Sequence, residues 1–152
     1  MPVHFFDTSA ISKHYHVESG TANVDALLGL PNVRQVISRL SVVEFHSVFA
    51  KKVRIGDLDP AHFQKLTRRF RGDVGARRLR VIRLTAAHFQ LAERLIRRIG
   101  LTNGLRTLDA LQLAVAITLN EPGEPIKFVC ADRSLCTLAI GEGLSVVNPE
   151  VV

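Results

Sequence analysis

The chain has 152 residues, of which 47% are hydrophobic, and its 20 Lys and Arg outnumber 14 Asp and Glu to give a formal net charge of +6. This length suits a single domain with a substantial core over residues 1–152 and excludes two domains of ordinary size. The positive charge favours a polyanionic partner, nucleic acid first. Because no apolar run approaches the roughly 18 residues of a membrane span, we expect a cytoplasmic protein without membrane association.

Short runs of β-branched and aromatic residues alternate with longer segments of helical periodicity. This alternation predicts an α/β fold, a small, mostly parallel sheet of five strands with helices on both faces. Strands are expected at residues 3–6, 33–37, 79–83, 127–130 and 144–147. Helices are expected at residues 8–16, 20–28, 41–54, 60–71, 86–99, 106–120 and 134–142.

Four acidic residues stand beside segments that should build the core: Asp7, Glu44, Asp109 and Asp132. A buried carboxylate without a partner is costly, so acids in such places suggest a shared counter-charge. Ligands of parallel sheets bind past the carboxyl ends of the strands, and residues early in a following helix reach the same edge. Converging carboxylates would suit Mg²⁺ or Mn²⁺, which activates water for attack on a phosphodiester.

Each acid also has a structural interpretation. Asp7 could cap the first helix, and Asp132 could form a turn into a helix cap. Glu44 stands three residues after a serine, as in a capping box. Asp109, surrounded by apolar residues, is the hardest to explain in this way, although Arg106 could pair with it from one turn earlier.

The segments that carry these acids resemble the motifs of the PIN-domain family, especially the VapC-type toxin ribonucleases of bacterial toxin-antitoxin modules. The resemblance lies in residues 5–10 with Lys13 following, 41–44, 105–114 and 128–135. These motifs extend from one end of the chain to the other. Each motif is weak alone, but four in this order are fairly specific.

The resemblance implies a three-layer α/β/α sandwich and a Mg²⁺- or Mn²⁺-dependent endoribonuclease. Asp7 and Asp109 would be the principal metal ligands, Asp132 would hold the metal directly or through water, and Glu44 would complete the site. Ser9, with Thr8 beside it, would support the acids through hydrogen bonds. The implied partners are an RNA substrate, a small antitoxin protein and a second copy of the chain in a homodimer.

Arginine is concentrated between residues 68 and 83. We expect Arg77 and Arg78, together with Arg106, to contact RNA phosphates, for which guanidinium groups are suited. The alternative for the arginine-rich stretch is a solvated face or a surface for an acidic partner.

Other functions fit the sequence less well. The histidines lack the spacing of a zinc site, and Cys130 and Cys136 match neither a redox pair nor a zinc knuckle, which indicates reduced, buried packing residues. A haloacid-dehalogenase-like phosphatase needs a second acid where Ser9 stands, and a phosphoryl-accepting receiver needs acids that the chain lacks. The open alternatives are a non-catalytic nucleic-acid or protein-binding module and a housekeeping PIN nuclease without an antitoxin.

Overall fold

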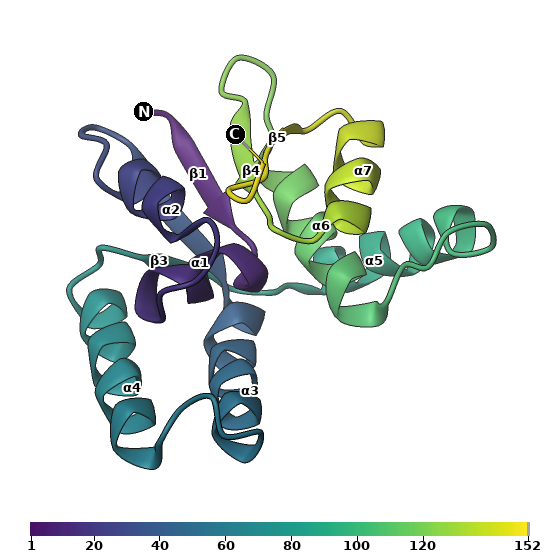
Figure 1. The fold of residues 1–152 in the computed structure, drawn as a ribbon. Helices are drawn as coiled ribbons and strands as arrows, with labels where there is room; N and C mark the ends of the chain where they lie inside the picture. Colours follow the sequence, from purple (N-terminus) through teal and green to yellow (C-terminus); the bar gives the residue numbers. More distant parts are fainter. Residues whose placement is uncertain (152) are drawn as a thin grey trace.

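A computed structural model describes residues 1–151 as a twisted sheet with helices packed on both faces (Figure 1). The sheet order is β3-β2-β1-β4-β5, and every pairing is parallel. Its strands are β1 (Val3–Phe6), β2 (Arg34–Ser38), β3 (Arg80–Ile82), β4 (Ile126–Val129) and β5 (Ser145–Val147). The α/β prediction is confirmed, and the expected mostly parallel sheet is parallel throughout.

Seven helices cover the sheet over the described residues. They are α1 (Thr8–Tyr15), α2 (Thr21–Leu28), α3 (Arg39–Arg54), α4 (Pro60–Gly75), α5 (Ala86–Ile99), α6 (Thr107–Leu119) and α7 (Arg133–Gly141). Helices α1 to α4 lie on one side of the sheet and α5 to α7 on the other (Figure 1). The result is a three-layer α/β/α arrangement.

The pleat of the strands divides the apolar side chains between two cores. Phe5 packs with the core formed by α5, α6 and α7, whereas the next residue, Phe6, packs with α1, α3 and α4. In β4, Phe128 likewise packs in the first of these cores and Val129 in the second. Consecutive residues of a strand face opposite sides of the sheet, so a strand buried on both faces reads as a continuous apolar run.

The order of the strands places a topological switch at β1. The chain adds β2 and β3 on one side of β1 and then crosses over to add β4 and β5 on the other. In open α/β sheets such a switch opens a crevice beyond the carboxyl ends of the two strands that flank it. That crevice lies past Phe6 and Val129, where the acidic residues begin.

Most element boundaries fall within a few residues of those expected. The strand Val3–Phe6 and the helix Ala86–Ile99 match the prediction, whereas α3 begins at Arg39, two residues early, and α4 continues to Gly75, four residues late. Gly72 does not end α4, because a glycine costs a helix only about 1 kcal/mol. Within residues 1–151, no helix is both long and apolar enough to cross a membrane.

Candidate active site at the carboxyl edge of the sheet

Asp7 is the first residue past β1 and the N-cap of α1. Its backbone N–H donates to the Val129 carbonyl at 2.9 Å, which joins it to the end of β4. Its carboxylate accepts from the backbone N–H of Ser9 at 3.1 Å and from the Ser9 hydroxyl at 2.5 Å, and only 5% of the residue is exposed. The expected helix cap is therefore present, and the cap is also a buried carboxylate at the switch point.

Asp109 and Asp132 approach the same edge from two further helices. Asp109 is the third residue of α6, and no hydrogen bond or ion pair within residues 1–151 ends on its carboxylate. Asp132 caps α7 by accepting from the Leu135 N–H at 3.0 Å, as its turn-and-cap interpretation predicted. Both acids line an open hollow of about 360 Å³, together with Glu44 and Arg106.

Glu44 occupies a different position in its helix from the one that the sequence suggested. The capping-box interpretation is wrong, because α3 begins at Arg39 with Ser38 as its N-cap, so Glu44 lies in the second turn of the helix. Its carboxylate instead accepts from the Thr8 hydroxyl at 2.9 Å and from the Gln112 amide at 3.2 Å. Hydrogen bonds from α1 and α6 therefore hold this side chain.

The four carboxylates affect one another electrostatically. Burial raises the pKa of Asp7 against the opposing hydrogen bonds from Ser9, and the charge of Glu44 raises it further. Burial also raises the pKa of Asp109, with added repulsion from Asp7 and Asp132 that Arg106 partly offsets. The pKa of Glu44 is likewise raised by burial and by Asp109, against hydrogen bonds from Thr8 and Gln112.

Within the described part of the chain, no side-chain cation neutralises these acids by direct contact. Within residues 1–151, none of the ion pairs includes any of the four, and the pair between Arg106 and Asp109 that the sequence offered as a structural alternative is absent. Residues 1–151 also contain no group of three or more His, Cys, Asp or Glu side chains that are already arranged to hold a metal ion. Mg²⁺ commonly keeps several waters and takes only one or two protein carboxylates, so the acids fit this kind of ion.

Comparisons with known proteins identify the family of the chain. The sequence matches the PIN domain family over residues 4–141. The chain belongs to the PIN domain family. PIN domains are generally nucleases, and PIN nucleases generally use divalent metal ions.

The fold of this PIN domain also matches solved structures. A chain of a toxin-antitoxin complex from Klebsiella pneumoniae superposes with a TM-score of 0.64 and 18% sequence identity, over 96% of this chain and 97% of that one. At this identity the likeness establishes the shared fold. The search of curated proteins found no match.

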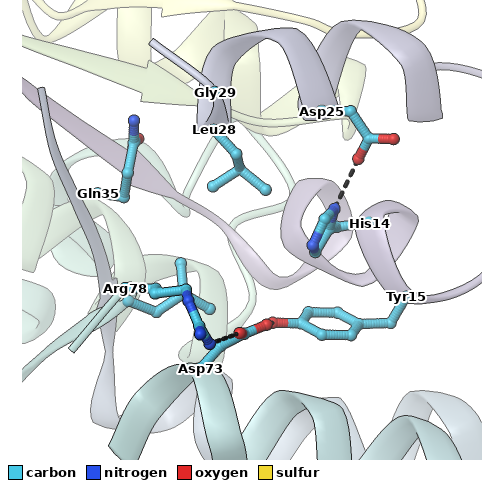
Figure 2. Close-up of a pocket in the computed structure, with 9 residues that line it drawn as sticks. His14, Tyr15, Asp25, Leu28, Gly29, Gln35, Asp73 and Arg78 are labelled. Carbon is cyan, nitrogen blue, oxygen red and sulfur yellow. Dashed lines mark hydrogen bonds and ion pairs between the residues drawn. The ribbon is translucent and has the colours of Figure 1, made fainter. Parts of the chain in front are cut away.

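Two of the arginines expected to bind RNA lie away from the acids of the PIN domain. Arg77 and Arg78 precede the amino end of β3, whereas Asp7 and Asp132 follow the carboxyl ends of β1 and β4. Arg78 is bound to Asp73 at 2.7 Å beside a second hollow, which Tyr15 also lines (Figure 2). Of the three predicted arginines, Arg106 is the one that shares the hollow of the acids.

Lys13, the basic residue of the first motif, is buried and lies outside the acidic hollow. Its ammonium group pairs with Glu150 at 2.7 Å and with Glu18 at 3.2 Å. A buried ammonium group needs such partners. Lys13 therefore fastens the C-terminal segment to α1 and does not offset the charge of the acids.

Sequence reasoning missed the polar group that lies beneath the acids. Gln112 of α6 is 1% exposed and contacts Ser38, Ser41, Thr8 and Glu44. The available signal was a single glutamine in the otherwise apolar stretch 110–117 of α6, since a fully buried amide must find partners. The identity of those partners could not be read from the helix alone.

Proposed function

We propose that this PIN domain is a Mg²⁺- or Mn²⁺-dependent endoribonuclease. The observation that carries the proposal is the set of four carboxylates gathered beyond β1 and β4, none of which pairs with a cation of residues 1–151. Burial, together with repulsion within this set, raises the pKa values of Asp7, Glu44 and Asp109, which is unfavourable at neutral pH unless a cation binds. A divalent ion resolves this conflict, and the surrounding chain is basic enough to attract RNA.

Asp7 and Asp109 would be the principal metal ligands, with Asp132 holding the ion directly or through water. Glu44 would complete the site, and Ser9 would fix the position of the Asp7 carboxylate through the 2.5 Å hydrogen bond. The chemistry that the ion supplies when bound is activation of water and stabilisation of negative charge on the phosphate. Arg106, which lines the same hollow, would contact an RNA phosphate.

Metal-dependent cleavage of RNA by the purified protein tests this function. Asp109→Asn is the control, because it removes a charge while keeping the shape of the side chain. We expect wild-type cleavage that requires Mg²⁺ or Mn²⁺ and a variant that cleaves at least about 100-fold more slowly. Equal cleavage by the two proteins would indicate a contaminating nuclease and refute the catalytic role.

We further propose that the protein is the toxin of a toxin-antitoxin pair and acts as a homodimer. Support comes from the motifs of the chain and from the fold, which is also found in a chain of the toxin-antitoxin complex from Klebsiella pneumoniae. Expression of the wild-type protein should arrest growth, and Asp7→Ala should relieve the arrest. Normal growth on expression of the wild-type protein would favour a housekeeping nuclease. Growth arrest by the wild type and by Asp7→Ala alike would favour a non-catalytic binding module. The antitoxin candidate would be a small protein with a DNA-binding N-terminus, encoded by a reading frame next to the gene of this chain.

A further inference from the structure

A continuous polar network runs beneath the acidic hollow and ends on Glu44. It joins Ser38 at the end of β2, Ser41 in α3, Thr8 in α1 and Gln112 in α6. Ser38, Ser41 and Gln112 are at most 1% exposed, and Thr8 is 4% exposed. Four side chains from different parts of the sequence thus meet in the interior, where each polar group requires a partner.

The contacts of Gln112 determine how its amide group is oriented. Its oxygen accepts from the Ser38 hydroxyl at 2.7 Å, and its nitrogen lies 2.9 Å from the Ser41 hydroxyl and 3.2 Å from Glu44 Oε1. A flipped amide would place its oxygen against the carboxylate oxygen of Glu44, and neither atom could donate. The Glu44 carboxylate therefore fixes the amide with its N–H groups facing the acid.

The hydroxyl protons follow from this orientation. Thr8 donates its one hydroxyl proton to Glu44 Oε1 at 2.9 Å, so in its 2.8 Å contact with Ser41 it must accept. Ser41 in turn accepts from Gln112, and Gln112 accepts from Ser38. Every donor in the network therefore points towards Glu44.

The network ends on one oxygen of Glu44. Oε1 receives hydrogen bonds from Thr8 and Gln112, whereas none of the hydrogen bonds within residues 1–151 uses Oε2. Glu44 also lines the hollow that holds Asp109 and Asp132. The network occupies one carboxylate oxygen and leaves the other for the hollow.

We propose that Gln112 is a positioning residue of the nuclease, which orients Glu44 so that one carboxylate oxygen faces the acidic hollow. This inference rests on the proposed function, because it assigns Gln112 a task in the same site. Gln112 lies beneath the acids and acts through Glu44. Removal of residues that orient ligands of a metal site typically lowers activity or metal affinity by about 10- to 100-fold.

The test compares Gln112→Met with Gln35→Met in the full-length protein. Both changes replace a buried glutamine by an apolar side chain of similar length, and Gln35 lies in the amino half of β2, where its amide donates to the Leu27 carbonyl. We expect kcat of Gln112→Met to fall about tenfold or more with KM within about twofold. Gln35→Met should lower the melting temperature without lowering kcat.

A double mutant separates positioning from general support of the fold. In the Glu44→Ala background, Gln112→Met should cause no further loss of kcat, because a residue that acts through Glu44 has nothing left to orient. An equal loss of kcat in both backgrounds would overturn the inference, as would a Gln112→Met enzyme as active as wild type. Absence of wild-type cleavage would instead refute the proposed function.

A crystal structure tests the positioning role without measuring activity. A crystal structure of Gln112→Met should show the Glu44 carboxylate rotated away from its contact with Thr8, with the backbone of α3 unchanged. If that variant does not fold, Ser38→Ala removes the donor to the Gln112 oxygen and should cause a smaller loss of kcat. An unchanged Glu44 rotamer in the variant that crystallises would contradict the positioning role.

Discussion

Acidic side chains line two hollows of this molecule. The acids of one hollow have side-chain partners that offset their charge, whereas an acid of the other has none within residues 1–151. Beside α1 and α2, Asp73 accepts from Tyr15 and from Arg78, each at 2.7 Å, and Asp25 lies 2.6 Å from a histidine nitrogen (Figure 2). Beyond β1 and β4, Asp109 has no such partner within residues 1–151. Acids that support the fold are paired, whereas acids that the chain leaves unpaired reduce stability and are available to a cation.

The largest expected effect contrasts Asp109→Asn with Asp73→Asn. Asp109→Asn should lower RNA cleavage at least about 100-fold, because a proposed metal ligand is lost. Asp73→Asn weakens two hydrogen bonds and should lower the free energy of unfolding by about 1–2 kcal/mol, with cleavage at saturating RNA within about twofold. Cleavage rates and denaturant titrations measure both variants. Similar losses of cleavage in the two variants would abolish the distinction between the hollows.

Metal binding should stabilise the protein only through the acids beyond β1 and β4. Mg²⁺ at about 100 times its dissociation constant would add about 2.7 kcal/mol to the free energy of unfolding at neutral pH. Thermal melts with Mg²⁺ and with EDTA should show this gain for wild type and for Asp73→Asn, and much less of it for Asp109→Asn. A gain of equal size in all three proteins would place the metal elsewhere.

Three of the acids beyond β1 and β4 should also shape the pH dependence of stability without metal. The raised pKa values of Asp7, Glu44 and Asp109 mean that the folded protein binds more protons than the unfolded chain. This contribution to stability is present at acidic pH and is lost as pH rises from the ordinary carboxyl range through the raised folded-state pKa values.

Asp109→Asn removes one of these charges. In EDTA, its melting temperature should exceed that of wild type by about 2–4 °C at neutral pH, equivalent to about 1 kcal/mol for a domain of this size. The excess should shrink towards pH 4. A variant less stable than wild type at neutral pH would show that Asp109 has a stabilising partner.

The smallest expected effect concerns the arginines at the two edges of the sheet. Arg106→Gln should weaken RNA binding and reduce the slope of log affinity against log salt by about 0.7 for each lost phosphate contact. Neutralising Arg77 and Arg78 should also weaken binding and flatten the salt dependence if RNA extends to the amino edge. Fluorescence anisotropy at several salt concentrations gives both slopes. Unchanged affinity at low salt would exclude Arg77 and Arg78 from the RNA-binding surface.

The sequence predicted the elements whose signals are local. The helix Ala86–Ile99 follows an apolar stripe, and the strand Val3–Phe6 is a short β-rich run that ends at an acid. The predicted start of α3 was wrong, because Ser38 is both the last residue of β2 and the N-cap of the helix. A later serine followed by Glu44 imitated the capping signal.

By itself, the sequence determined the α/β class and the positions of four acids at strand ends and in helices, because periodicity and capping depend on residues that are close along the chain. Only the tertiary structure showed that Arg78 is paired at the far edge, that Asp109 has no partner among residues 1–151, and that Gln112 reaches Glu44 across 68 positions of sequence. Such contacts depend on strand order and on helix rotation, which set the distances between side chains that no local pattern connects.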